Sequence, residues 1–410
     1  MDPGLQLHRD NVHLQSPTGS SNCGEGTSCV AIVVMAGLTL PQECTRVTQG
    51  SACTYLCGVM SHIAAHKDII DTANAHQRKT GLSYDIVVMH DESIPGSILD
   101  SIDALSLRRL PLSKDLKLFA CMGMEEDREN HKASASLCEQ AVDFNTTTTK
   151  HNGEALRMLR LRTIQQMKPA AAALTNYDAV VFLDQDAYVL NAESLADTAK
   201  NFIDQDKQFL TSLGGRSPVN AGVWFMKPSQ KATEAWLEDL GGGFSEEGGW
   251  DKRGQTPQVW PEAIRANPGQ IGKKGAWNFV GADKDQGLLW DIFGLKLKSM
   301  AVGGFTDYIK DMEAPNLEGV EFVSSESIHA SADHITGSPK PYQHEPCRGL
   351  EHRDKRILNA LKLIAPSTRK FFGMNKDGQH EHPSLLKQCS LRLDASVSQC
   401  RESMARQSKK

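Results

Sequence analysis

Continuous apolar runs are the clearest feature of the hydrophobic pattern along this chain. Such runs, rich in β-branched or aromatic residues, predict strands that are buried on both faces of a sheet; they cover residues 30–35 and 179–183. The segments 84–89 and 219–226, each interrupted by one polar residue, are also interpreted as strands. A weaker run at 116–121 is interpreted as a further strand. The run at 179–183 gives the strongest signal, and it ends abruptly in Asp184-Gln185-Asp186.

Apolar residues at helical spacing alternate with these runs. The spacing predicts helices over residues 53–66, 154–173, 194–206, 230–240 and 285–293. Residues 99–116 are interpreted as helical at first and turn-like around Pro111, and the polar stretches 38–51, 122–150 and 241–275 as loops. Because strands and helices alternate, we predict an α/β fold with a mainly parallel sheet.

Composition narrows the classes of protein that this chain can belong to. A formal net charge of −5 and the lack of a basic stripe with interleaved aromatic residues argue against nucleic-acid binding. The longest apolar stretch, 29–40, is too short for a membrane-spanning helix. Residues 1–28 lack the apolar centre of a signal peptide. We therefore expect a cytoplasmic protein, with the Golgi lumen as the alternative if an N-terminal anchor is missing.

The ten cysteines follow no regular spacing and form no Cys-x-x-Cys pair. Cys53 and Cys57 are four residues apart and could share a helix face. A zinc site would need two further ligands at matched spacing, and none follows nearby. We expect ordinary semi-buried thiols.

The two carboxylates at the end of the run 179–183 are the first candidate for chemistry. Asp184 and Asp186 are two residues apart, so both can point the same way. Ligands of α/β proteins bind in the crevice past the carboxyl ends of the parallel strands. A hard divalent cation, which prefers oxygen ligands, would neutralise the pair. An acidic turn without a metal fits Asp-x-Asp alone equally well.

Three further motifs follow in order along the chain. They are an Asn220-Ala221-Gly222-Val223 segment that leads to Pro228-Ser229, Asp285-Gln286-Gly287, and a segment with His334, Gly337, Lys340, Pro341 and Tyr342. Together with Asp184-Gln185-Asp186, this set resembles the family 8 glycosyltransferases, the group that includes glycogenin and galactinol synthase. The last motif is the most specific. Tyr342 stands where that family usually has Trp, and Gln185 where a small residue is common.

The resemblance covers roughly residues 30–345 and implies a GT-A fold: a Rossmann-like α/β single domain with a mixed, mainly parallel central sheet flanked by helices. It implies a domain over 29–345, with a nucleotide-binding part at about 29–190 and a part that completes the acceptor and metal site at about 191–345. We expect residues 1–28 to be a disordered tail. Residues 346–410 are polar, and we expect an accessory tail with a few short helices.

The resemblance also implies ligands and roles. Asp184, Asp186 and His334 would bind a divalent metal, Mn²⁺ or Mg²⁺. Lys340 would neutralise the diphosphate of a nucleotide sugar, which is expected to be UDP-linked, and Gly337 would let the backbone approach the phosphate. Lys168 is a second basic candidate, for which an ordinary helix-surface lysine is the equal alternative.

Four residues are assigned to the sugar by the same resemblance: Asn220 to its hydroxyls, Gly222 to the close approach of its ring, and Asp285 with Gln286 to the reacting carbon. An N-cap of a helix is the alternative role of Asp285, and both roles are compatible. The implied reaction is transfer of a hexose from the nucleotide sugar to a hydroxyl acceptor, such as a carbohydrate, with retention of configuration.

Two other functions are open at this point. The chain could be a catalytically inactive relative that binds a nucleotide sugar or a glycan, although such a protein would have no chemical need for an intact metal triad. A metal-dependent nucleotidyltransferase would also use Asp-x-Asp, but it would not need the motif from His334 onward. The sequence is also compatible with a homodimer.

Overall fold

The protein is described by a computed structural model. It places residues 14–24, 26–37, 52–123, 135–143, 153–214, 217–245, 248–250, 277, 279–303, 318–323, 326–335, 346–347, 351–372 and 384–408.

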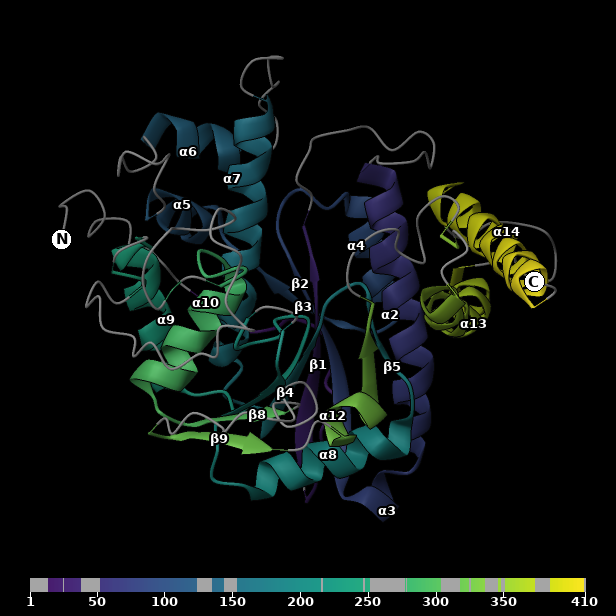
Figure 1. The fold of residues 1–410 in the computed structure, drawn as a ribbon, viewed down its shortest axis with the longest axis horizontal. Coiled ribbons are helices and arrows are strands. Elements are labelled where there is room, and N and C mark those ends of the chain that lie inside the picture. Colours follow the sequence, from purple (N-terminus) through teal and green to yellow (C-terminus); the bar gives the residue numbers. More distant parts are fainter. Residues whose placement is uncertain are drawn as a thin grey trace.

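A mixed sheet of eight strands runs through the middle of the molecule (Figure 1), in the order β3-β2-β1-β4-β7-β6-β8-β9. Among these strands β7 is antiparallel to both of its neighbours, and every other pair is parallel. The strands are β1 (Ser28–Ala36), β2 (Leu82–His90), β3 (Arg108–Pro111), β4 (Ala179–Leu183), β6 (Phe209–Ser212), β7 (Val223–Met226), β8 (Met300–Gly303) and β9 (Val320–Val323). The predicted α/β fold, with a mixed and mainly parallel central sheet flanked by helices, is confirmed.

Helices cover both faces of the sheet. One face carries α5 (Lys114–Met122), α6 (Ala135–Val142), α7 (Gly153–Gln166), η1 (Lys168–Ala173), α9 (Gln230–Gly242), α10 (Asp285–Leu289) and the π-helical η2 (Trp290–Lys296). The other carries α2 (Ala52–Ala75), α4 (Gly96–Ala104), α8 (Ala192–Asp204) and α12 (Glu326–Ser331). A short helix, α3 (Gln77–Thr80), follows α2.

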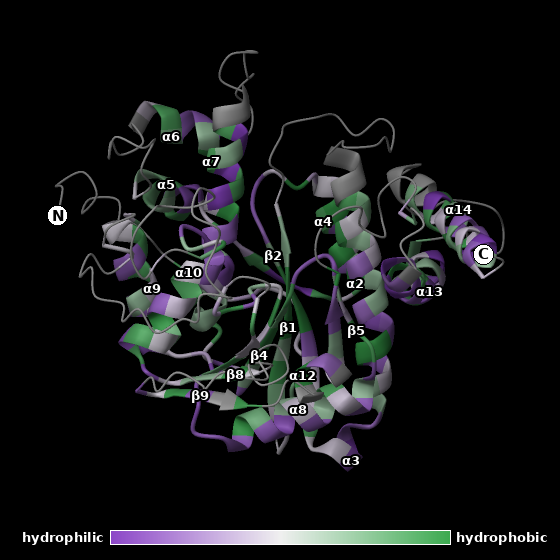
Figure 2. Cartoon of the chain, in the orientation of Figure 1, coloured by the Kyte–Doolittle hydropathy of each residue, from purple (hydrophilic) through white to green (hydrophobic). Residues whose placement is uncertain are grey.

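Alternation along β1 explains the two layers of core. Ala31 and Val33 belong to the apolar cluster under η1 and α9, whereas Val30 and Ile32 belong to the cluster under α2 and α8. Successive strand side chains point to opposite faces, so a strand between two helical layers must be apolar at every position. Figure 2 shows the result: the central strands are hydrophobic, while the helices carry hydrophilic turns outward.

The region between β2 and α6 differs from the prediction. Residues 116–121, expected as a strand, lie in helix α5, whose first turn is capped by Ser113: its Oγ accepts a hydrogen bond from Leu116 N at 3.2 Å. Pro111, expected in a turn, is the last residue of the edge strand β3. Proline has no backbone N–H, and at the edge of a sheet this removes no hydrogen bond between strands. A short apolar run does not by itself distinguish strand from buried helix.

The predicted helix 154–173 is two elements rather than one. The α-helix α7 ends at Gln166, and the 3₁₀-helix η1 begins at Lys168. Pro169 at the start of η1 has no backbone N–H to donate within a continuous α-helix. The break fixes Lys168 in a buried position next to the carboxyl end of β4.

Residues 346–410 differ most from expectation. The described part holds two long helices, α13 (Glu351–Phe372) and α14 (Ser384–Gln407), which pack against each other and against α2. Ile357, Leu361 and Ile364 of α13 share an apolar cluster with Tyr188 and Ile335 of the main domain. The helices therefore have a common core with the main domain.

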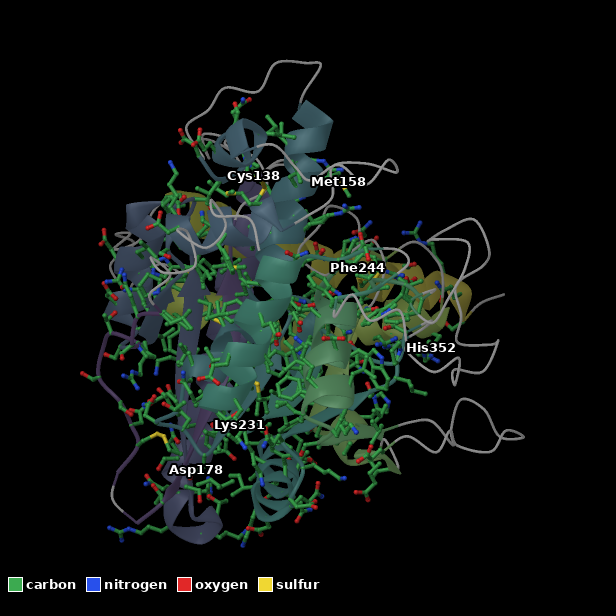
Figure 3. All side chains as sticks on the ribbon, turned by 90° about the vertical axis from the view of Figure 1, so that its left-hand side faces the viewer. Cys138, Met158, Asp178, Lys231, Phe244 and His352 are labelled. Atoms are coloured by element: carbon green, nitrogen blue, oxygen red, sulfur yellow. A yellow bond between two sulfur atoms is a disulfide. The ribbon has the colours of Figure 1, made fainter. Side chains whose placement is uncertain are left out.

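Eight of the cysteines pair as disulfides, which corrects the expectation of free thiols. The pairs are Cys23–Cys29, Cys57–Cys389, Cys121–Cys138 and Cys347–Cys400. Cys138 and Met158, labelled in Figure 3, mark the α6–α7 corner where one of these bonds lies. Cys44 and the side chain of Cys53 lie outside the described residues. The sequence separations range from 6 to 332 residues, so no regular spacing could reveal the pairing.

The described part of the predicted N-terminal tail contacts the sheet. Thr18 forms a backbone bridge with Arg109, and Ser21 Oγ donates to Asp85 Oδ2 at 2.6 Å. Residues 1–13 lie outside the described residues. No helix among the described residues is both long and apolar enough to span a bilayer.

Candidate metal centre

The carboxyl end of β4 places the two aspartates of Asp184-Gln185-Asp186. Asp184 N donates to Gly222 O at 2.9 Å, and the chain then turns, with Ala187 N donating to Asp184 O at 2.8 Å. After the turn, β5 (Ala187–Val189) pairs with β10 (Ala332–His334) in an antiparallel two-stranded ribbon. This ribbon brings His334 beside the aspartates, although the sequence separates them widely.

Asp184, Asp186 and His334 form a cluster. Each offers one ligand atom, and these atoms all lie within 4.8 Å of one another. His334 Nε2 is 3.5 Å from Asp186 Oδ1. The Asp184 side chain is 29% exposed, and those of Asp186 and His334 are 11% and 17% exposed, so the cluster opens to solvent mainly through Asp184. Two carboxylates and one imidazole form a donor set that suits Mn²⁺ or Mg²⁺ and leaves coordination positions open.

Asn220 determines which nitrogen of His334 faces the aspartates. Its Oδ1 accepts from Gly222 N at 2.9 Å, which fixes the orientation of the amide. The same oxygen is 3.0 Å from His334 Nδ1, so Nδ1 must carry the proton and donate. His334 Nε2 is the ring nitrogen that faces Asp186, and it is the one left to bind a metal. A hydrogen bond that sets the tautomer of a ligating histidine is the usual arrangement around bound metals.

Gly222 makes room for the imidazole. A Cβ at this position would lie 2.2 Å from His334 Cε1 and 2.5 Å from both ring nitrogens. The resemblance assigned this glycine to the close approach of a sugar ring. In the structure it lies directly against the ring of His334, so any larger residue would displace the candidate ligand.

Lys168 lies on the inner side of the site and is buried. Its Nζ is 2.8 Å from Asp184 Oδ1 and 2.6 Å from Asp285 Oδ2, and it donates to Ala221 O at 3.2 Å. Burial alone would lower the pKa of Lys168, but Asp184 and Asp285 outweigh it and raise that pKa. The surface-lysine alternative is therefore excluded: Lys168 is a permanently charged group between two carboxylates.

The pKa of Asp184 is raised above its usual range. Burial is the main cause, Lys168 opposes it, and the neighbouring charge of Asp186 adds to it. Two carboxylates at close range disfavour each other's ionised form. A divalent cation would offset both the cost of burying the Asp184 carboxylate and its repulsion from Asp186. The residues present therefore fit a bound metal ion.

Asp285 and Gln286 start helix α10 and lie at the same end of the sheet. The N-cap of α10 is Lys284 and not Asp285, so the N-cap alternative for Asp285 is wrong. Asp285 is the first residue of the helix; its Oδ1 accepts from Gln286 N at 2.9 Å, and its other oxygen binds Lys168. Gln286 lies against Gly281, where a Cβ would come 2.8 Å from Gln286 Oε1. The structure thus joins Asp285 to the metal cluster through Lys168.

Two predicted phosphate ligands cannot be placed. Gly337 and Lys340, like Tyr342, lie outside the described residues, which resume at 346 after Ile335. Ile335 N donates to Asp186 O at 2.8 Å, which continues the ribbon up to that point.

Sequence reasoning missed two histidines behind the site. His62 Nε2 donates to Ala187 O at 2.7 Å, and His66 Nε2 accepts from Val189 N at 3.2 Å. Both lie on α2 and are fully buried. Burial lowers the pKa of His62 well below its usual value and that of His66 to about 4, so both are neutral at pH 7. Two histidines four residues apart on an apolar helix face were the available signal.

The sequence matches no family model, and no curated protein is significantly similar to it. Among solved structures, it is similar to one described as the apo form of the bifunctional glycosyltransferase WbbM, with 12% identity and a TM-score of 0.37. The match covers 84% of this chain and 52% of that one. This chain thus spans about half the length of the structure that it matches.

Proposed function

We propose that this protein is a metal-dependent glycosyltransferase that moves a hexose from a nucleotide sugar, UDP-linked, to a hydroxyl acceptor with retention of configuration. The observation that carries the proposal is the convergence of Asp184, Asp186 and His334, with His334 Nδ1 bound to Asn220 and its Nε2 directed toward Asp186. The order of the sequence motifs and the confirmed α/β fold support the same activity.

In this proposal Asp184, Asp186 and His334 hold Mn²⁺ or Mg²⁺. Such an ion would neutralise the negative charge that develops on the diphosphate as it leaves. Asn220 keeps the imidazole in its ligating tautomer, while Lys168 holds Asp184 and Asp285 in place by its two ion pairs. Lys340 and Gly337 remain predicted contacts of the diphosphate.

Asp285 and Gln286 remain the predicted contacts of the reacting sugar, together with Asn220. The ion pair with buried Lys168 fixes the carboxylate of Asp285 next to the place where positive charge would develop on the sugar. We propose front-face transfer, in which the leaving diphosphate takes the proton of the acceptor hydroxyl as that hydroxyl bonds to the sugar. A glycosyl adduct trapped on Asp285 would contradict this mechanism.

A screen of UDP-sugars tests the proposal. The native chain should hydrolyse or transfer one of them with Mn²⁺ and stop when a chelator is added. Asp186→Ala should lose that activity by at least about a hundredfold, since it removes a metal ligand. Asp206→Ala, which changes an exposed aspartate, is the matched control and should match the native chain.

The alternatives are outcomes of the same screen. Mn²⁺-dependent binding of a nucleotide sugar without turnover would favour an inactive, sugar-binding relative. Transfer of a nucleotidyl group in place of a sugar would favour a nucleotidyltransferase. Turnover by Asp186→Ala at the native rate would overturn the metal centre.

We also infer that the protein works in an oxidising compartment, such as the Golgi lumen, and not in the cytoplasm. The support is the set of four disulfides, two of which tie the C-terminal helices in place. Structural disulfides persist in secretory compartments and are rare in the cytosol. The sequon Asn145-Thr146-Thr147 gives a readout. Protein from eukaryotic cells should lose mass on treatment with an N-glycosidase and resist thiol alkylation; reactive thiols on freshly isolated, folded protein would contradict the inference.

A further inference from the structure

The ribbon of β5 and β10 carries two of the three candidate ligands. Asp186 directly precedes β5, and His334 is the last residue of β10, opposite Ala187. A two-stranded ribbon of three residues a side is only marginally stable by itself. The distance between Asp186 and His334 therefore depends on whatever holds the ribbon from outside.

Arg356 of α13 holds the β10 side. Its guanidinium makes a two-pronged contact with the carboxylate of Asp333, with Nε 3.1 Å from Oδ2 and Nη2 bound to Oδ1. The same Nη2 donates to the backbone oxygen of His334 at 2.7 Å. Arginine is suited to this task because its donors form a rigid planar fork. One side chain thus fixes both the residue before the ligand and the backbone of the ligand itself.

Helix α13 is in turn fixed to the main domain. The ribbon residues Tyr188 and Ile335 are buried in one apolar cluster with Ile357, Leu361 and Ile364 of α13. Two disulfides secure that cluster: Cys57–Cys389 joins α2 to α14, and Cys347–Cys400 joins the segment before α13 to α14. Figure 1 shows α13 and α14 stacked outside α2, on the side of the molecule where β5 lies.

We propose that Arg356 is a positioning residue that sets the place of His334 in the metal centre, so that the C-terminal helices contribute to metal affinity. The inference rests on the proposed metal site. Arg356 itself touches neither metal nor substrate, and it acts through the backbone of His334. Residues that orient metal ligands from outside usually contribute about 10–100-fold to metal affinity.

The experiment compares Mn²⁺ affinity and thermal stability in the full chain. Arg356→Gln should bind Mn²⁺ about 10–100-fold more weakly. Saturating Mn²⁺ should restore most of its turnover, and Arg356→Lys should lose less affinity because it keeps the charge. Arg369→Gln is the matched control on α13: Arg369 is 61% exposed and pairs with Asp394 of α14. It should bind Mn²⁺ as the native chain does.

A merely structural role would lower the melting temperature and leave the Mn²⁺ affinity of the folded protein unchanged; that result would overturn the inference. If Arg356→Gln does not fold, Asp333→Asn replaces it, since that variant loosens the fork while keeping both strands. Native Mn²⁺ affinity in Asp333→Asn would then overturn the inference. Failure of the metal site itself looks different: the native chain and Asp186→Ala would bind Mn²⁺ equally poorly.

Discussion

The cluster at the carboxyl end of β4 and the cluster between α9 and η2 each place a lysine among carboxylates. At the carboxyl end of β4, Lys168 lies between Asp184 and Asp285. Between α9 and η2, Lys296 contacts Asp239 and lies 3.9 Å from Asp291. The side chains of Asp239 and Asp291 are fully buried, whereas Asp184 is part of an open cluster that also contains Asp186 and an imidazole.

The difference shows how a candidate metal site is distinguished from an acidic cluster that only supports the fold. In the closed cluster around Lys296, that lysine contacts Asp239 and the exposed Glu238, while the side chains of Asp239 and Asp291 are fully buried. In the open cluster, Lys168 neutralises the inner side, and the outer side presents two carboxylates and a histidine in its ligating tautomer. Carboxylates near a lysine are therefore insufficient; accessible donors of mixed type are the distinguishing feature.

Lys296→Met should have the largest effect, and it should lower the free energy of unfolding without changing metal affinity. The substitution breaks the ion pair between Lys296 and buried Asp239, and breaking a buried ion pair costs about 3–5 kcal/mol. Urea unfolding should report that loss, while the Mn²⁺ affinity of the folded variant stays at the native value. Lys298→Met is the control, because its partner Glu318 is 80% exposed. Equal stability of the two variants would contradict the structural role of the closed cluster.

Asp184→Asn should have the next largest effect, and on metal affinity. Loss of a direct ligand should weaken Mn²⁺ binding by more than about a hundredfold, beyond the effect of residues that only orient ligands. Titration calorimetry measures it. Asp291→Asn, the same change in the closed cluster, should leave the affinity unchanged; weaker binding in both variants would remove the distinction between the clusters.

Gly222→Ala tests whether metal binding needs the space that Gly222 leaves for the imidazole of His334. The added methyl group would meet the imidazole at 2.2 Å, so the ring must move and Mn²⁺ should bind about 10–100-fold more weakly. Gly96→Ala is matched to it, because a Cβ there meets no atom within 4 Å. A native-like affinity in Gly222→Ala would show that His334 does not bind the metal.

Asp291→Asn should have the smallest effect, a small gain in stability at pH 7 from the relief of repulsion between two buried carboxylates. Burial raises the pKa of Asp239 well above its usual value, and the charge of Asp291 raises it further. A carboxyl whose pKa is raised by folding stabilises the protein fully below its unfolded pKa, and this contribution is lost as pH rises through the folded pKa. Removing the charge of Asp291 reduces that loss.

Chemical unfolding across pH checks the sign. The gain from Asp291→Asn should vanish in acid, where both carboxyl groups of the native protein are protonated. A gain of equal size at every pH would point to packing and not to charge.

The parts of the fold predictable from sequence were those with a strong local signal. The run 179–183 coincides with β4, and the strand and helix that precede it, 84–89 and 53–66, lie within β2 and α2. Four-residue strands such as β6 and β8 were missed because so few residues carry little periodicity. Their pairing is decided by neighbouring strands instead.

The candidate site also contains both residues that the sequence identified and residues that it did not. Asp184, Asp186 and His334 could be selected from motifs, and the structure brings them together. Among the partners that hold them, His62 and His66 had only their helical spacing as a signal, and Arg356, which binds the backbone oxygen of His334, had none. A hydrogen bond to a backbone oxygen leaves no trace in the residue type that carries it. Only the folded chain identifies such partners.

The Cys57–Cys389 bond, whose two residues are 332 positions apart, constrains how the protein is made. At a synthesis rate of about 5–20 residues per second, Cys57 emerges from the ribosome roughly 15–70 seconds before its partner. During that interval other cysteines of the chain are present and can capture it. Correct maturation should therefore depend on disulfide exchange after release of the chain, and expression hosts rich in disulfide isomerase should yield more active protein than hosts that merely oxidise thiols.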